Sequence, residues 1–248
     1  MLPSLAIARG ILRSLRIYYG DRPRRDAMQA LYAGFVKPGD LAFDIGAHVG
    51  DRIAAFRKLG ARVVALEPQP ALARLLRLLY AFDRNVTIVA AAAGRAAGES
   101  ELLLNLENPT VSTLSADFVK AADGAAGWEG QRWSEPVRVA VVTLDELIAR
   151  HGTPAFIKID VEGFEAEALA GLTRPVAALS FEFTTIQRDV AAACIARCAA
   201  LGYARFNAAL GESQTFVHAD WQSAEAIGRW LAELPHAANS GDIYAAHS

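Results

Sequence analysis

Residues 41–51 read LAFDIGAHVGD, a short apolar run that ends in an acid and a glycine-rich turn. LAFDI has the length and composition of a buried strand, and residues 51–59 have the apolar spacing of a helix. Gly46 permits the tight turn between them, and Gly50 lets the backbone approach a ligand closely. A strand, a glycine turn and a helix in this order predict the first unit of an α/β fold with a ligand site at the turn.

The rest of the chain repeats this alternation. Further strands are expected at 62–67, 86–91, 155–160 and 176–183, with later candidates in YARFN (203–207) and QTFVH (214–218). Helical spacing covers 70–82, 144–151, 164–172, 187–201 and 222–234. Apolar strands that alternate with helices are typical of a mostly parallel sheet covered on both faces, so we predict a doubly wound α/β fold.

The composition excludes several classes of protein. Hydrophobic residues make up 53% of the 248 residues, which is enough for a core and excludes global disorder. The 25 basic and 27 acidic residues give a net charge of -2, so no broad basic field for nucleic acid is expected. No run reaches the roughly 18 apolar residues of a membrane span, and the first residues lack the charge pattern of a secretory signal.

The spacing of the two cysteines indicates the cellular compartment of the protein. Cys194 and Cys198 are four residues apart in a segment with helical spacing, which disfavours both a mutual disulfide and a CxxC redox motif. We expect them to fill a helix-facing core and the protein to be cytoplasmic.

The N-terminal residues stand outside the alternation, so we expect a helical extension at 1–35 before a domain at 36–248. Arg9, Arg13 and Arg16 share one helical face, which is expected to lie opposite the apolar residues Leu5, Leu12 and Leu15. Such a basic amphipathic helix either packs over the domain or makes a weak peripheral contact with an anionic membrane surface, and both interpretations stay open.

A second region with little periodicity runs from Leu106 to Pro136. Segments of this length inside a compact domain are usually lids, binding loops or disordered. Trp128 and Trp133 are interpreted either as lid residues that grip a sugar face or as anchors that hold the segment onto the domain.

Acids surround the glycine turn and indicate the charge of the ligand. Asp44 precedes Gly46, and Asp51 lies on the first helical turn, where both would repel a diphosphate and attract a cation. His48 replaces the middle glycine of a dinucleotide GxGxxG pattern. Glu67 ends the second strand about twenty residues further on, where a carboxylate accepts hydrogen bonds from ribose hydroxyls. These positions favour S-adenosylmethionine, a cationic nucleoside without phosphate.

A second group of charges follows two later strands. In IKIDVEGFE the alternation puts Lys158 and Asp160 on the side opposite the isoleucines. A buried Lys158 requires an ion pair, with Asp44 or Asp160, or an exposed cleft. Asp160 and Glu162 lie at the strand's carboxyl end, where open α/β sheets bind ligands, and Glu182 at the end of the next strand can converge on the same cleft.

Four strings, FDIGAHVGD, VVALEPQP, VTLDEL and IKIDVEGFEAEALAGL, resemble the FkbM family of methyltransferases in order and spacing over residues 36–185. The resemblance implies a class I, Rossmann-like fold with a seven-stranded sheet whose last strand is antiparallel. It also implies S-adenosylmethionine as cofactor and O-methylation of a small-molecule acceptor, a sugar or a secondary metabolite.

The expected site residues follow from these patterns and the resemblance. The residues expected to bind the cofactor are Asp44, Gly46, Ala47, His48, Gly50, Glu67 and Pro68. The residues expected to serve the acceptor hydroxyl are Asp160, Glu162 and Glu182, with His48 as a further candidate base and no metal ligand assigned. An NAD-dependent sugar oxidoreductase and a noncatalytic nucleoside-binding module are the alternatives, and the sequence does not tell which carboxylate is the base.

Overall fold

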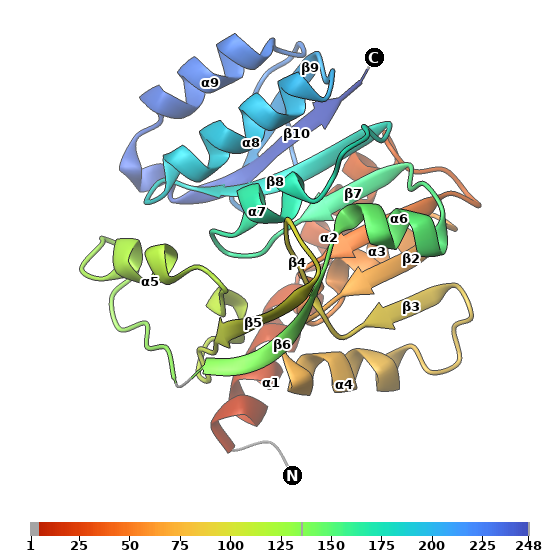
Figure 1. Cartoon of the computed structure of the whole chain (residues 1–248), viewed down its shortest axis with the longest axis vertical. Helices are drawn as coiled ribbons and strands as arrows, with labels where there is room; N and C mark the ends of the chain where they lie inside the picture. The colour runs from red at the N-terminus through yellow and green to blue at the C-terminus, as the bar shows by residue number, and fades with distance from the viewer. Residues whose placement is uncertain (1–4, 135, 248) are drawn as a thin grey trace.

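The computed structural model describes residues 5–134 and 136–247. The first four residues of the N-terminal extension and Glu135 of the 106–136 segment therefore lie outside it. A seven-stranded sheet forms the centre, in the order β3 (Val86–Val89), β2 (Arg62–Leu66), β1 (Leu41–Ile45), β7 (Phe156–Ile159), β8 (Ala178–Thr184), β10 (Ser240–Ala246) and β9 (Arg205–Leu210). All paired neighbours are parallel except β10, which is antiparallel to both β8 and β9 (Figure 1). The predicted α/β class and mostly parallel sheet are confirmed.

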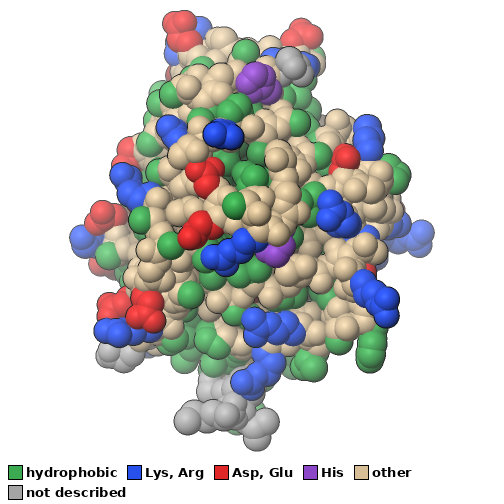
Figure 2. Space-filling model, turned by 45° about the vertical axis from the view of Figure 1, so that its right-hand side comes forward, with side chains coloured by type: hydrophobic (Ala, Val, Ile, Leu, Met, Phe, Trp, Pro, Cys, Tyr) green, Lys and Arg blue, Asp and Glu red, His purple; other side chains and the backbone are tan. Residues whose placement is uncertain are grey.

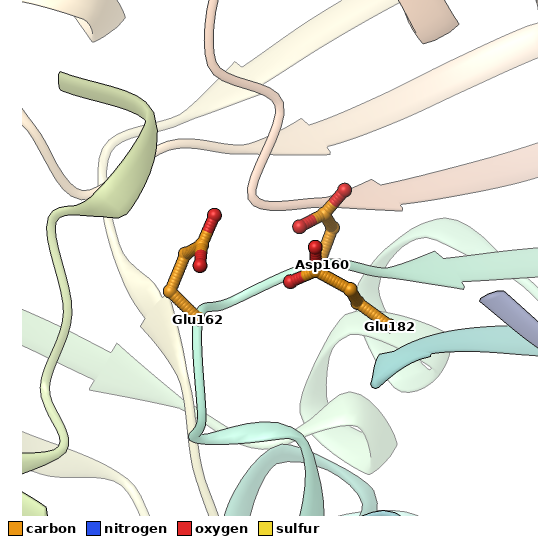
Figure 3. A group of neighbouring side chains, drawn as sticks. All are labelled: Asp160, Glu162 and Glu182. Atoms are coloured by element: carbon orange, nitrogen blue, oxygen red, sulfur yellow. The ribbon is translucent and has the colours of Figure 1, made fainter. Parts of the chain in front are cut away.

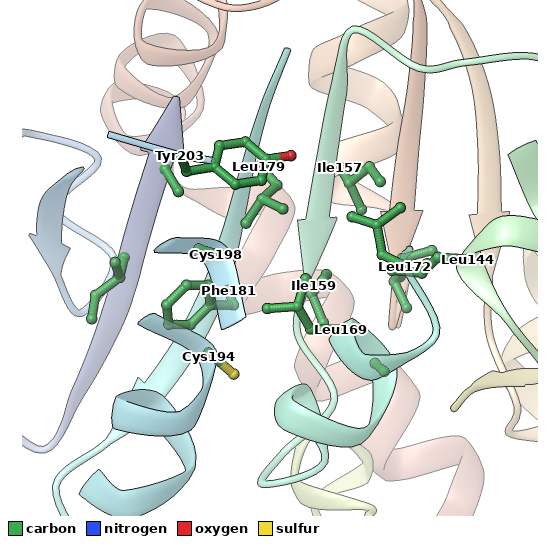
Figure 4. Packing of buried hydrophobic residues seen from close by; sticks show 14 of the residues in the cluster. Leu144, Ile157, Ile159, Leu169, Leu172, Leu179, Phe181, Cys194, Cys198 and Tyr203 are labelled. Carbon is green, nitrogen blue, oxygen red and sulfur yellow. The ribbon is translucent and has the colours of Figure 1, made fainter. Parts of the chain in front are cut away.

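Helices cover both faces of this sheet (Figure 1). They are α1 (Leu5–Gly20), α2 (Arg22–Tyr32), α3 (Asp51–Lys58), α4 (Pro70–Leu79), α5 (Ala116–Ala122), α6 (Leu144–His151), α7 (Glu165–Ala170), α8 (Arg188–Ala200) and α9 (Ala224–Glu233). Ile157 and Ile159 of β7 pack into one core cluster together with Cys194 and Cys198 of α8, both free thiols (Figure 4). Phe156 points to the opposite face, into a second cluster. This alternation makes the sheet doubly wound.

Helix α6 shows why local sequence predicted some elements to the residue. Thr143 accepts a hydrogen bond from the backbone N–H of Glu146, and the Glu146 carboxylate accepts one from the backbone N–H of Thr143. This capping box fixes the start of the helix, and Gly152 follows its end with a positive φ of 100°.

Two features of the sheet differ from the prediction. QTFVH is not a strand, because residues 214–218 form a loop. The antiparallel strand is instead β10, which lies between β8 and the edge strand β9 and whose Gly241 and Asp242 weaken the signal of a strand. The structure also contains a smaller sheet of β4 (Ala92–Ala93), β6 (Pro136–Val142) and β5 (Gly98–Leu103), which was not predicted.

The orientation of α1 corrects the sequence interpretation. Leu5 and Leu12 are exposed on the same side as the arginines, not opposite them. The buried residues of α1 are Gly10 and Ser14, and a Cβ at Gly10 would lie 2.7 Å from Pro109 Cδ. Because α1 packs through its small residues, Leu5, Leu12 and Ile17 remain exposed, and Leu15 is half-buried. Within the described residues no helix is both long and apolar enough to cross a membrane.

The segment from Leu106 to Pro136 is ordered over its described residues, with a 3₁₀ turn, η1 (Pro109–Val111), and helix α5. Trp128 packs edge-on against Phe118 and donates its indole N–H to Asn239 Oδ1 at 3.1 Å. Trp133 donates to the Val111 carbonyl at 2.8 Å. Both indoles therefore anchor the segment onto the domain, and neither lines the cavity described below.

Candidate active site

A cavity of about 860 Å³, including its open mouth, lies at the carboxyl ends of β1, β2, β7 and β8. This is the edge at which open parallel sheets bind ligands. Among the predicted site residues, those that line the cavity are Asp44, Gly46, Ala47, His48, Glu67, Pro68, Asp160, Glu162 and Glu182. The structure thus brings together two groups that are more than ninety residues apart in the chain.

The two glycines of the first turn have different roles. Gly46 has a φ of 88°, and an added Cβ would lie 1.8 Å from the Asp160 carbonyl oxygen, so glycine lets the ends of β1 and β7 approach each other. Gly50 also has a positive φ, but an added Cβ would meet the Leu76 side chain at 2.7 Å. Gly50 does not line the cavity, and its small size serves packing against α4 and not close approach to a ligand.

Glu67 is fixed at the end of β2 with its carboxylate toward the cavity. It is 2% exposed, and its two oxygens accept backbone N–H groups from His48 at 2.7 Å and from Gln69 at 2.8 Å. Burial raises the pKa of Glu67 to about 8, although these two hydrogen bonds oppose the shift. Each carboxylate oxygen has a second lone pair, so Glu67 can still accept hydrogen bonds from a bound diol.

Asp44 and Asp51 have different partners in the structure, although the sequence predicted the same role for both. Asp51 is ion-paired with Arg24 at 2.9 Å and with Arg52 at 2.8 Å, so its charge is already neutralised and the expectation that it attracts a cationic ligand is wrong. Asp44 is 1% exposed, and its Oδ2 has no hydrogen-bond partner within the described part of the chain. Burial raises the pKa of Asp44 to about 7. Asp44 is therefore the carboxylate at this turn that needs a partner.

Lys158 is fully buried and bridges two strands. Its Nζ lies 3.1 Å from Asp160 Oδ2, one of the two partners expected from the sequence, and 2.8 Å from Asp242 Oδ1 of β10. Arg52 Nη2 lies 3.9 Å from the same Asp160 oxygen. Desolvation raises the pKa of Asp160, but Lys158 and Arg52 outweigh it and the net shift is downward. Asp160 is therefore ionised at neutral pH.

Glu162 and Glu182 complete the group, and their pKa values are shifted in the direction opposite to that of Asp160. Figure 3 shows the three carboxyl groups projecting toward one region, with one oxygen from each within 4.8 Å of the others. Burial, followed by the charge of Asp160, raises the pKa of both glutamates well above the usual range. One carboxyl group with a lowered pKa beside two with raised pKa values is an arrangement that can accept and donate protons.

The third acid of the DVEGFE string has a structural role. Glu165 Oε1 accepts the backbone N–H groups of Val161 at 3.0 Å and Gly163 at 3.3 Å. These bonds hold a turn in which Glu162 and Gly163 have φ values of 53° and 84°. The turn directs Glu162 into the cavity, so Glu165 positions a site residue without lining the cavity itself.

Sequence reasoning missed several residues of the cavity wall. They come from α1, from the segment around η1, and from the alanine run after β3, and they include Tyr18, Thr110, Ser112, Ala92 and Ala93. The Tyr18 ring packs edge-on against the His48 ring at 5.3 Å. Burial lowers the pKa of His48 to about 4, so its ring is neutral at neutral pH. The only available signal was the alanine run, whose small side chains leave room for a flat ligand.

Solved methyltransferases resemble this chain weakly. A precorrin-6Y C5,15-methyltransferase from Geobacter metallireducens is 15% identical, with a TM-score of 0.45, over 90% of this chain and 87% of that one. A TehB-like SAM-dependent methyltransferase from Corynebacterium glutamicum is 12% identical, with a TM-score of 0.47, over 90% and 88%. Aeropyrum pernix fibrillarin with bound S-adenosyl-L-methionine is 13% identical, with a TM-score of 0.45, over 85% and 68%.

No curated protein matches this chain in sequence. The family comparison is decisive, because the model of the methyltransferase FkbM domain matches residues 44–234. That range begins at Asp44 and contains the glycine turn, Glu67 and the three carboxylates of the cavity. The chain belongs to the FkbM methyltransferase family, and S-adenosylmethionine is its cofactor.

Proposed function

We propose that this methyltransferase acts on a hydroxyl group of a small-molecule acceptor, a sugar or a secondary metabolite. The observation that supports O-methylation is the convergence of Asp160, Glu162 and Glu182 on one cavity. A hydroxyl is a poor nucleophile until its proton is partly removed, and a positioned carboxylate provides this for about a 10²- to 10⁴-fold gain in rate.

The cavity suits the cofactor in three places. Glu67 accepts hydrogen bonds from the ribose hydroxyls, and the unpartnered Oδ2 of Asp44 receives the cationic methionine end. Ala92 and Ala93, together with Leu102, provide a small apolar wall for the adenine ring. The bound cofactor supplies a methyl group on a positively charged sulfur. Gly46, Ala47, His48 and Pro68 shape the wall between these contacts.

The three carboxyl groups, with the neighbouring cations Lys158 and Arg52, accept the proton that leaves the acceptor hydroxyl. The acceptor hydroxyl donates a hydrogen bond to Asp160 or Glu162, and its proton passes to that carboxylate as the hydroxyl oxygen is methylated. Lys158 and Arg52 already place positive charge beside Asp160, so we propose that no metal ion is needed. Alignment of the methyl donor and the acceptor provides the larger part of the rate enhancement, because positioning can lower the activation barrier by roughly 7 to 11 kcal/mol at most.

The chemistry of transfer is tested with cofactor that carries a ¹³C-labelled methyl group and a panel of hydroxylated acceptors. The product's methyl carbon is expected to be bonded to oxygen in its NMR spectrum. A methyl group on carbon or nitrogen would refute O-methylation, and binding of the cofactor without turnover of any acceptor would support the noncatalytic alternative.

Residue roles are tested by Glu162→Gln, which keeps the shape but removes a proton site. Single-turnover transfer is expected to fall by about 10² while cofactor affinity stays within a few fold. Glu101→Gln, an exposed position on β5, is the matched control and should keep the full rate. If cofactor affinity falls in proportion to rate, Glu162 belongs to the cofactor site.

A further inference from the structure

The exposed large apolar side chains of this protein are concentrated on two helices. Outside the undescribed residues, seven such side chains are exposed, and six of them belong to α1 or to α4 and the turn after it. They are 52% to 101% exposed, and they are Leu5, Leu12, Ile17, Leu78, Leu79 and Phe82. Scattered single apolar residues are normal on a surface, but a concentration on adjacent elements marks an interaction site.

Helices α1 and α4 are neighbours, linked at two points. Pro109 packs against Gly10 of α1, and its carbonyl accepts a hydrogen bond at 2.9 Å from Gln69, which precedes the first turn of α4. At the other end, the hydroxyls of Tyr19 and Tyr80 donate to the carbonyls of Val49 and Gly50, each at 3.1 Å. In Figure 1 the two helices form the lower edge of the molecule.

The same two elements carry unpaired positive charge. Their exposed arginines are Arg9, Arg13, Arg16, Arg74, Arg77 and Arg84. Among the described residues, none of these arginines forms an ion pair. Residues 5–20 and 70–82 contain no acid, and Asp83 is paired with Arg57 at 2.7 Å. The lower right of Figure 2 accordingly shows blue and green side chains with almost no red. We call these six arginines and six apolar residues the α1/α4 face.

We propose that the α1/α4 face docks on the surface of an anionic lipid bilayer. Interleaved arginine and large apolar side chains fit a membrane interface, since the apolar groups enter the headgroup boundary while the guanidinium groups meet lipid phosphates. A nucleic acid would leave the six apolar side chains in water. A second copy across a twofold axis would set the arginines against their own counterparts. Anionic lipid is the partner that contacts both the arginines and the apolar side chains favourably. This proposal does not depend on the identity of the methyl acceptor.

The test is sedimentation of the full chain with phosphatidylcholine vesicles, with and without phosphatidylglycerol. Binding is expected on the anionic vesicles and should weaken as salt is raised, because surface charges are screened. The triple variant Arg9→Gln, Arg13→Gln, Arg16→Gln should bind anionic vesicles on the order of 100-fold more weakly. Equal binding of the native protein to neutral and anionic vesicles, or no binding to either, overturns the proposal.

A second triple variant separates the effect of this face from the effect of net charge in general. The triple variant Arg62→Gln, Arg132→Gln, Arg174→Gln makes the same change of charge at exposed positions elsewhere and should bind as the native protein does. Equal loss of binding in both triple variants overturns the assignment of the face.

The apolar half of the face is tested by Phe82→Ser, whose side chain is fully exposed, so that the fold is not at risk. This variant should weaken vesicle binding several fold, while Val217→Ser, the exposed apolar side chain outside the face, should not. Unchanged binding of Phe82→Ser, or a concentration-dependent dimer that Phe82→Ser disrupts, overturns the membrane proposal. Binding of duplex DNA as tight as that of vesicles does so too.

Discussion

Replacing Glu67 with alanine should weaken cofactor binding through the loss of ribose contacts. The carboxylate ends β2 inside the cavity, and both of its oxygens are held in place by backbone N–H groups at 2.7 and 2.8 Å. A side chain held in this way loses little conformational entropy when it accepts a further hydrogen bond from a ligand.

The magnitude follows from the number of hydrogen bonds. Above about pH 8, where Glu67 is ionised, a hydrogen bond to its charged carboxylate contributes about 1.5 to 3 kcal/mol, so losing one corresponds to a Kd about 10- to 150-fold higher. Loss of both ribose contacts gives a larger effect. Glu67→Gln keeps the side-chain volume and one acceptor oxygen, and should fall between the native protein and Glu67→Ala.

The assay is calorimetric titration with S-adenosylhomocysteine and with its 2′-deoxy and 3′-deoxy ribose analogues. The native protein should discriminate against the deoxy analogues, and Glu67→Ala should lose that discrimination. If Glu67→Ala weakens all three ligands equally and still discriminates, Glu67 acts only by holding the His48 and Gln69 backbones. Unchanged affinity in a folded Glu67→Ala protein would remove Glu67 from the site altogether.

Three further outcomes are expected. Asp242→Asn should lower the free energy of unfolding by about 1 to 3 kcal/mol in urea denaturation, because it leaves buried Lys158 with one carboxylate, and Asp220→Asn at an exposed position should have no effect. In the cofactor-free protein, burial raises the pKa values of Glu67 and Glu165 to about 8 and about 7. Their contribution to the free energy of unfolding is therefore complete below about pH 4.5 and is lost as the pH rises through 7 and 8. A urea denaturation midpoint that does not decrease as the pH is raised from 6 to 9 would contradict this. Removal of divalent cations with a chelator should leave the rate of methyl transfer unchanged, and a loss that magnesium restores would show that the acid cluster binds a metal ion.

The sequence predicted the features of the site that depend on local order. Asp160 follows β7 and Glu182 lies near the carboxyl end of the adjacent parallel strand β8, so their approach could be inferred from strand ends alone. Glu67 was found in the same way. Gly46 was recognised as a turn residue, but the group that its missing Cβ accommodates, the Asp160 carbonyl, lies over one hundred residues away. Nothing near Gly46 in the chain identifies that contact.

Features set by tertiary packing could not be predicted. The expectation that Asp51 attracts a cationic ligand failed because its partner Arg24 comes from α2, and no pattern in the sequence places α2 beside α3. The expectation that the leucines of α1 lie opposite its arginines failed for a related reason, because the helix packs closely through Gly10 and Ser14 and leaves Leu5 and Leu12 exposed. Close contact selects small residues, so the large apolar residues on the other side are free for a second surface.

Lys158 connects the catalytic proposal with the architecture of the sheet. A fully buried ammonium group is tolerated only with carboxylate partners, and it has two: Asp160 at the cavity and Asp242 on the antiparallel strand β10. Lys158 thus contacts two carboxylates, and its charge lowers the pKa of Asp160, whereas burial and the charge of Asp160 raise the pKa values of Glu162 and Glu182. The strand that sequence patterns missed therefore supplies the second counter-charge of Lys158, the residue that lowers the pKa of Asp160, and for this reason Asp242 is expected to influence catalysis without lining the cavity.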